Sequence, residues 1–214
     1  LNYGIEVYGL NYFNQKAETI EFNVLITQQW KDEYIVWNDT EYGTDVLKID
    51  SLDIWNPDLE LYNSGKKPFS FSGDNSKLKV YSDGRVLWSR FATYTFSCML
   101  NLKDFPYDKQ TCHLLFGSWK HSKAQLDLKP FTNESSFRDI SVYSEFSHNE
   151  WDISKTFVSH MDIEYLCCPG ELYPNTEFYI ELERHSMKYT IVIIFAVFIT
   201  LSGFAVSFVS ITNY

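Results

Sequence analysis

The chain has 214 residues, of which 45% are hydrophobic and 18% aromatic, and its formal net charge at pH 7 is -10. That length is enough to bury a full core, and no internal repeat or Pro/Ser/Gly-rich linker divides the chain, so we expect one large domain. The acidic charge argues against nucleic acid as a partner, because phosphate binding needs clustered Lys and Arg, and it instead favours small cations near the surface.

The chain before residue 189 reads as β-sheet. Residues 20–26 and 176–183 alternate apolar with polar side chains, which is the period of a half-buried strand. Asp83 and Gly84 form a turn signal between two strand-like stretches and predict a hairpin. Because no long amphipathic helix is expected before residue 189, the sequence predicts an all-β domain with the fold of an antiparallel β-sandwich.

Cysteines and sequons indicate an extracellular domain. Asn38 and Asn133 each begin an Asn-X-Ser/Thr sequon and are candidate glycosylation sites. Four cysteines, an even number, fit an oxidising compartment. Cys98 and Cys112 enclose 13 residues between strand-like segments, and a disulfide closing this loop would stabilise the fold by about 3 kcal/mol.

Residues 189–211 carry no charge over 23 positions. A helix of this length reaches about 34 Å and the bilayer core is about 30 Å thick, so we predict a transmembrane helix, with a buried helix of a soluble protein as the alternative. Arg184, His185 and Lys188 precede the span, and a simple positive-inside count would put them in the cytoplasm. Long domains translocate regardless of such charges, so the sequons and cysteines decide the expected orientation.

Several motifs, in this order and spacing, resemble those of the Cys-loop receptors, the pentameric ligand-gated ion channels. The loop between Cys98 and Cys112 contains Phe-Pro-Tyr-Asp, W-x-P-D stands at residues 55–58, and GSW stands at 117–119. Adjacent cysteines between two tyrosines are similar to those of α-type subunits of the nicotinic acetylcholine receptor branch. The resemblance implies a neurotransmitter-binding β-sandwich at residues 1–186 and a first transmembrane helix at 187–214, with the remaining spans absent from this sequence.

The resemblance also implies an aromatic cage for a cation. A quaternary ammonium cannot donate a hydrogen bond and is held by the faces of aromatic rings, each worth about 0.5–2 kcal/mol. The expected agonist is acetylcholine or a related amine, bound between neighbouring subunits of a homo- or hetero-pentamer, and no cofactor is expected. The residues matching the ligand-binding positions of the family are Tyr62, Trp119, Tyr165, Cys167, Cys168 and Tyr173, with Leu25 on the complementary face.

Cys167 and Cys168 are expected to form a disulfide with each other. Such a bond closes a strained eight-membered ring and adds little stability, so its use would be local, in stiffening a hairpin tip and offering a flat sulfur surface. A zinc site with His121 or His160 is the alternative, although neighbouring residues seldom both reach one tetrahedral ion, and no metal site is expected. No nucleophile or paired-carboxylate signature stands out, so no enzyme is expected.

Some positions depart from the family's pattern. Leu25 stands where complementary faces usually present a tryptophan. Leu115 stands where many nicotinic subunits carry a lysine, and Asn175 where they carry the aspartate that partners it. We therefore expect the hairpin between Tyr165 and Tyr173 to close by different contacts in this chain.

The route from site to pore is expected to pass through the domain junction in the plasma membrane. Hairpin closure would rotate the sandwich and bias a closed/open equilibrium. Asp108, Phe105 and Tyr107 would face the membrane domain from the loop tip, together with the turn between the first two strands. The expected coupling residues are Phe105, Pro106, Tyr107, Asp108, Arg184, Gln15 and Lys16.

Two other functions stay open. One is a binding protein of the same sandwich fold that sequesters transmitter without gating, which the predicted span opposes. The other is a single-pass adhesion domain, which would leave the aromatic set unexplained. The favoured interpretation is a synaptic receptor subunit with its ligand-binding domain outside the cell.

Overall fold

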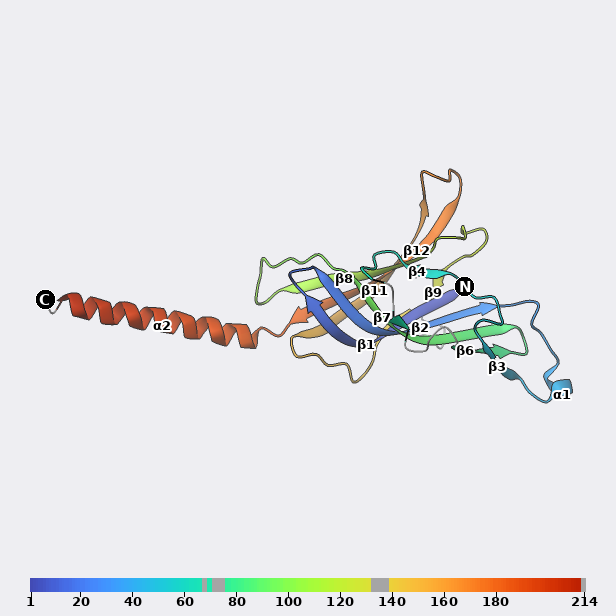
Figure 1. Ribbon diagram of the computed structural model, residues 1–214, viewed down its shortest axis with the longest axis horizontal. Coiled ribbons are helices and arrows are strands. Elements are labelled where there is room, and N and C mark those ends of the chain that lie inside the picture. Colours follow the sequence, from blue (N-terminus) through green and yellow to red (C-terminus); the bar gives the residue numbers. More distant parts are fainter. Residues whose placement is uncertain (67–68, 71–75, 132–138, 213–214) are drawn as a thin grey trace.

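A computed structural model describes residues 1–66, 69–70, 76–131 and 139–212 (Figure 1). The candidate glycosylation site Asn133 lies outside these residues. A β-rich body carries one long helix at its C-terminal end, pointing away from the sheets. The elements are β1 (Asn2–Asn14), β2 (Thr19–Lys31), α1 (Asp39–Tyr42), β3 (Val46–Asp50), β4 (Leu59–Leu61), β5 (Phe69–Ser70), β6 (Lys77–Tyr81), β7 (Arg85–Ser97), β8 (Lys109–Ser118), β9 (Lys129–Pro130), β10 (Ile140–Val142), β11 (Trp151–Glu164), β12 (Leu172–Arg184) and α2 (Met187–Thr212).

Two sheets form the predicted sandwich. The larger sheet has the order β10-β1-β2-β7-β6-β3, with β5 paired to β7 and β9 to β1, and the smaller sheet has the order β11-β12-β8-β4. Most pairs are antiparallel, as expected, but β10 and β9 run parallel to β1 at the sheet edge. β11 and β12 form the longest hairpin, and its tip projects from the body of the sandwich (Figure 1).

Alternation along the strands builds the core between the sheets. On β2 the side chains of Ile20, Phe22 and Val24 are fully buried, while Glu21 and Asn23 between them are only partly buried. The predicted strand at 176–183 lies in β12 and buries Phe178, Ile180 and Leu182 at alternate positions in the same way. Both sheets therefore contribute one apolar face, which is the arrangement that stabilises a sandwich.

The predicted hairpin at Asp83 and Gly84 joins β6 to β7. Gly84 has φ +85°, a conformation in which residues with a Cβ are strained, and an added Cβ would collide with the carbonyl oxygen of Asp32. The backbone N–H of Asp32 also donates to Gly84 O at 2.8 Å. The turn therefore requires glycine for both its dihedral angle and its close packing.

The predicted helix near the C-terminus is present as α2, Met187–Thr212. Over the residues that the structure describes, no helix is both long and apolar enough to cross a membrane, and the predicted span at 189–211 is not confirmed.

Candidate functional site

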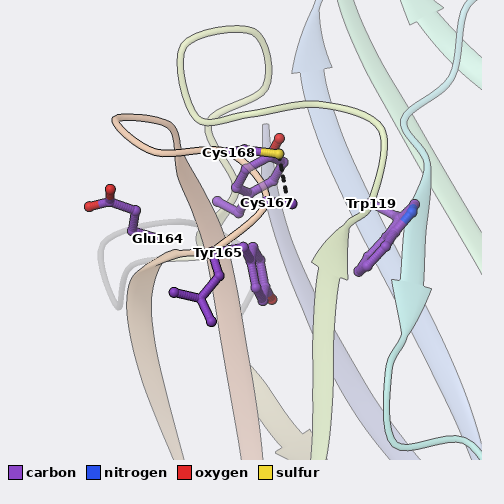
Figure 2. A pocket seen from close by; sticks show the side chains of 7 residues that line it. Trp119, Glu164, Tyr165, Cys167 and Cys168 are labelled. Atoms are coloured by element: carbon purple, nitrogen blue, oxygen red, sulfur yellow. Dashed lines mark hydrogen bonds between the residues drawn. The ribbon is translucent and has the colours of Figure 1, made fainter.

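A cavity of about 500 Å³ lies against the β11–β12 hairpin (Figure 2). Two tyrosines and the adjacent cysteines of the hairpin form its wall, and Trp119 faces them from the end of β8. The Trp119 side chain is 69% exposed, so the cavity is open on one side. Its lining residues are Trp119, Glu164, Tyr165, Leu166, Cys167, Cys168 and Tyr173.

Four aromatic rings form a continuous series at this site. The ring centroids of Tyr62 and Trp119 are 6.2 Å apart, those of Trp119 and Tyr165 6.3 Å, and those of Tyr165 and Tyr173 5.4 Å. Tyr62 contacts Trp119 edge to face and does not line the cavity. The structure therefore brings the predicted rings together, with three as cavity walls and Tyr62 behind Trp119.

Asp58 holds the loop that presents Trp119. Its carboxylate accepts hydrogen bonds from Ser118 Oγ at 2.7 Å and from the backbone N–H of Lys120 at 3.0 Å, the residues on either side of Trp119. His121 Nδ1 lies 2.7 Å from the same carboxylate. Burial alone would raise the pKa of Asp58, but the hydrogen bonds from Ser118, His121 and Lys120 outweigh it and lower the pKa.

The loop after Trp119 also fastens the hairpin. The backbone N–H of Lys123 donates to Leu172 O at 2.7 Å, at the start of β12. The ammonium group of the same lysine forms an ion pair with Asp162 on β11. One residue thus contacts both strands of the hairpin beside the cavity.

Carboxylates surround the hairpin tip. Glu164 Oε1 accepts from the backbone N–H of Gly170 at 2.8 Å, and Glu171 Oε2 accepts from the Tyr173 hydroxyl at 3.0 Å. That hydrogen bond to Glu171, followed by one to Cys168, raises the pKa of Tyr173 to about 12, so the phenol is neutral at ordinary pH. The cavity is therefore aromatic in its walls and acidic at its rim, which suits a cation.

Cys167 and Cys168 are free cysteines in the structure, so the predicted disulfide between them is not formed. Their sulfur atoms lie 2.6 Å apart at the exposed tip of the hairpin. The Cys167 thiol has a raised pKa, caused first by the hydrogen bond with Cys168, so its side chain is neutral. The zinc alternative lacks support: His121 contacts Asp58 and His160 contacts Thr176, and the described residues contain no cluster of three metal-ligating side chains.

Leu25 does not reach the aromatic cavity. It lies on β2 in the other sheet and lines a separate cavity of about 180 Å³ with Thr27 and Ser89. An aromatic cluster lies on the same sheet, where Tyr8 contacts Phe91 edge to face on β7 and stacks on Tyr143. Within one chain, the predicted ligand-binding set is thus split between two surfaces.

The opposite end of the sandwich contains the loop closed by a disulfide between Cys98 and Cys112, which confirms that predicted pair. Phe105 and Tyr107 of this loop are exposed by 42% and 64%. The Phe105 ring lies 5.0 Å from that of Tyr189, and the Tyr107 hydroxyl lies 3.0 Å from Thr190 Oγ1. Both partners are in the first turn of α2, so the loop contacts the helix as expected.

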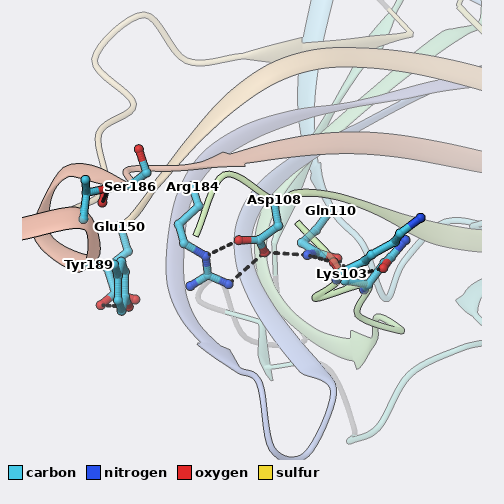
Figure 3. Close-up of polar contacts among 9 residues, drawn as sticks. Lys103, Asp108, Gln110, Glu150, Arg184, Ser186 and Tyr189 are labelled. Atoms are coloured by element: carbon cyan, nitrogen blue, oxygen red, sulfur yellow. Dashed lines mark hydrogen bonds and ion pairs between the residues drawn. The ribbon is translucent and has the colours of Figure 1, made fainter. Parts of the chain in front are cut away.

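The prediction that Asp108 faces the membrane domain is wrong, because the residue is buried. Its side chain is buried and pairs with Arg184, whose Nε and Nη2 donate at 2.7 and 3.0 Å (Figure 3). Gln110 Nε2 donates to the same carboxylate at 2.6 Å. Burial opposes ionisation of Asp108, yet the hydrogen bonds from Arg184 and Gln110 hold its pKa below the ordinary value. A buried carboxylate is stable only when it is paired, and Asp108 accordingly points inward to Arg184.

Arg184 is itself enclosed by aromatic rings. Its guanidinium carbon lies 4.2 Å from the ring centroid of Trp151, 5.1 Å from that of Phe105 and 5.5 Å from that of Tyr189. Pro106 follows Phe105 through a cis peptide bond. Arg184 ends β12, so the strand that begins at the cavity ends in this cluster.

Gln15 and Lys16 lie in the turn between β1 and β2, as predicted. The turn is at the same end of the sandwich as the disulfide loop and α2 (Figure 1). Glu18 O accepts from the backbone N–H of Cys98 at 2.8 Å, which joins the turn to the base of the loop. The described residues give no contact between Gln15 or Lys16 and α2.

Asn38, the other candidate glycosylation site, caps α1. Its side-chain oxygen accepts from the backbone N–H of Thr40 at 3.1 Å. The residue lies in a polar, exposed segment, and its modification stays a prediction.

The sequence did not reveal four residues that shape the site. Glu164 and Leu166 line the cavity because they flank Tyr165 at the end of β11, and their nearness to that tyrosine was the available signal. Asp58 belongs to the W-x-P-D motif, but its bonds to the loop of Trp119 depend on pairing between β4 and β8. Lys123 had no signal, since its partners are 39 and 49 residues away.

Comparisons with known proteins show the family and the fold. The family described as Neurotransmitter-gated ion-channel ligand binding domain matches residues 1–186. The chain is 36% identical over 178 residues to "Acetylcholine receptor subunit alpha-type acr-16" of Caenorhabditis elegans, covering 82% of this chain and 34% of the relative. It is 33% identical over 175 residues to "Neuronal acetylcholine receptor subunit alpha-6" of Rattus norvegicus, covering 81% and 34%. The chain thus spans about a third of the length of these curated relatives.

A solved structure has a similar fold. The crystal structure of AChBP from Bulinus truncatus matches with a TM-score of 0.74, covering 86% of each chain. The sequences are 20% identical, so this likeness concerns the fold alone. It confirms the predicted β-sandwich.

Proposed function

The chain belongs to the neurotransmitter-gated ion-channel ligand binding domain family, and from this premise we propose that its aromatic cavity binds acetylcholine or a related amine. As a member of this family the chain is a receptor domain and not an enzyme. The observation that carries the proposal is the series of rings from Tyr62 to Tyr173, in which Trp119, Tyr165 and Tyr173 form walls of a cavity with an acidic rim and Tyr62 stands behind Trp119.

The bound cation would lie against Trp119, Tyr165 and Tyr173. A quaternary ammonium is large and weakly hydrated, and the negative faces of three rings offset its loss of water. Glu164 and Glu171 add a long-range attraction that raises the local concentration of cations. Cys167 and Cys168 line the same cavity, and their sulfur atoms would offer a surface against which the ligand packs.

The open side of the cavity would be closed by a neighbouring subunit. Trp119 is too exposed to hold a desolvated cation from within one chain. The surface around Leu25 lies on the other sheet, so in a ring of five subunits it would face a neighbour's cavity. The pentamer would lie in the plasma membrane, with this domain outside the cell at the synapse.

Gating would follow β12 from the cavity to the junction. This strand pairs with β8 from Asn175 to Glu183 and ends at Arg184, so a displacement of the hairpin is carried along a continuous sheet. At its far end, Phe105 and Tyr107 contact α2. Hairpin closure on agonist would thus bias the position of the helix.

Binding of radiolabelled acetylcholine to membranes carrying the full-length receptor tests the proposal. We expect Trp119→Ala to weaken binding at least about tenfold, because it removes the ring that faces the hairpin. Tyr42→Ala, an exposed ring on α1, is the matched control and should bind as the wild type does. Undiminished binding in Trp119→Ala, or no binding in the wild type, would refute the proposed site.

A further inference from the structure

Two polar atoms with complementary hydrogen-bonding character lie unpaired behind the cage. Asn175 is 1% exposed, and its Nδ2 donates to the Tyr165 hydroxyl at 3.2 Å. Its Oδ1 is an acceptor without a hydrogen-bond partner among the described residues. The buried hydroxyl of Tyr62, which can donate, also lacks a partner among these residues. Buried polar groups of proteins are nearly always hydrogen-bonded, so such a pair calls for an explanation.

Gly117 brings the two atoms to the same place. This glycine pairs with Asn175 across β8 and β12. A Cβ added to it would lie 2.8 Å from the Tyr62 hydroxyl and would collide with Asn175 Oδ1. The absence of a side chain at residue 117 therefore leaves room for the phenol and the amide to approach each other.

The surroundings favour neutral partners. Leu115, two residues before Gly117 on β8, supplies no cation. Among the described residues, the titratable groups near the Asn175 and Tyr62 pair are the phenols Tyr3, Tyr165 and Tyr173 and the carboxyls Asp58 and Glu60. His160 on β11 has its ring turned to Thr176 Oγ1 at 3.0 Å. Burial, and after it the neighbouring Tyr165, raises the pKa of Tyr62 and keeps its hydroxyl a proton donor. An uncharged amide is the group that this site can hold without a counter-ion.

We propose that Asn175 is a positioning residue that ties Tyr62 and Tyr165 into one unit when ligand is bound. Its Nδ2 holds the Tyr165 hydroxyl, and its Oδ1 accepts the proton of Tyr62 as the hairpin closes. The rings on both sides of Trp119 are thereby fixed relative to each other through a neutral relay on β12. This inference rests on the proposed function, since it explains how that cage is held in shape.

A double-mutant cycle on the full-length receptor tests the relay, with radiolabelled acetylcholine as the probe. Asn175→Ala and Tyr62→Phe are each expected to weaken binding about five- to tenfold, and the double variant no more than the weaker-binding single variant, because both break the same unit. Asn11→Ala removes an asparagine that bonds Glu21 and Asn23 on the other sheet, and it should bind like the wild type. Additive losses in the double variant would overturn the relay.

A pH profile separates positioning from a general loss of folding. Asn175→Asp preserves the shape, and its carboxyl, buried without a Lys or Arg contact among the described residues, should have a raised pKa. When protonated it can donate and accept as the amide does, so binding should be within about threefold of wild type near about pH 5.5 and about tenfold weaker near about pH 8.5.

The two proposals fail in different ways. A wild-type receptor that binds no acetylcholine refutes the proposed function. If the wild type binds acetylcholine, two results would refute the relay without refuting the proposed cage. One is a ratio of Asn175→Asp affinity to wild-type affinity that is the same at every pH, and the other is an unchanged affinity in Asn175→Ala.

Discussion

Aromatic rings gather at both ends of the sandwich, but only the rings at the junction enclose a positive charge of the protein itself. At the junction, Arg184 lies over Trp151, which is fully buried, and its guanidinium is paired with Asp108. At the cavity, Trp119 is 69% exposed and no protein cation lies over its ring among the described contacts. The same attraction between a cation and a ring thus serves stability where it is buried and complete, and is available for binding where it is open.

The largest effect is expected from removing the built-in cation. Arg184→Ala leaves the carboxylate of Asp108 buried and unpaired, which should destabilise the domain by about 3–5 kcal/mol. The thermal midpoint of the detergent-solubilised full-length protein should fall by roughly 10 °C or more. Arg184→Lys should fall between this variant and the wild type, because it keeps the charge but loses the bidentate geometry.

Lys109 offers a matched control for Arg184. It forms an ion pair with Glu183 at 3.0 Å on the exposed side of the same strands, with about half of each side chain accessible. Lys109→Ala should lower the thermal midpoint much less than Arg184→Ala does, because exposed ion pairs contribute little to stability. Equal thermal midpoints for the two alanine variants would mean that the buried pair stabilises the domain no more than the exposed pair does.

At the cavity, the ring of Tyr173 should matter more than its hydroxyl. Tyr173→Ala removes a wall of the proposed cage and should weaken acetylcholine binding about tenfold. Tyr173→Phe loses only the hydrogen bonds of an exposed hydroxyl, to Glu171 and Cys168, and should weaken binding less than about threefold. Equilibrium binding to both variants measures this ratio. Equal losses would mean that the hydroxyl, and not the aromatic face, contacts the ligand.

The smallest effect concerns a surface pair near Arg184. The hydrogen bond with Asp152, then that with the Asn149 carbonyl, raises the pKa of His185, which lies next to the buried pair. Because the folded pKa exceeds the unfolded one, the pair stabilises the domain below the unfolded pKa of about 6.5 and loses this contribution as pH rises through the folded pKa.

Melting curves between about pH 6 and about pH 8.5 can isolate this contribution. Asp152→Asn should lower the midpoint relative to wild type at the acidic end, by less than about 2 °C for so exposed a pair, and match it at the alkaline end. Lys188 opposes the shift, and His148, whose pKa burial lowers, contributes in the other direction in both proteins. A constant gap across the range would rule out the titration of His185.

The sequence alone predicted the strands, the turn at Gly84, the disulfide between Cys98 and Cys112 and the four aromatic residues whose rings the structure places in series. Strand periodicity and turn chemistry are local, so they can be read from neighbouring residues, and motif order located the rings along the chain. The family resemblance also placed Arg184 at the junction.

Only the tertiary structure decided how these residues meet. Asp108 was expected at a surface and is instead buried against Arg184, 76 residues away. Tyr62 stands behind Trp119, and Leu25 lies on another surface of the chain. Which side chains share a site depends on sheet pairing across long stretches of sequence, because the register between β8 and β12, and not any local pattern, sets Asn175 opposite Gly117.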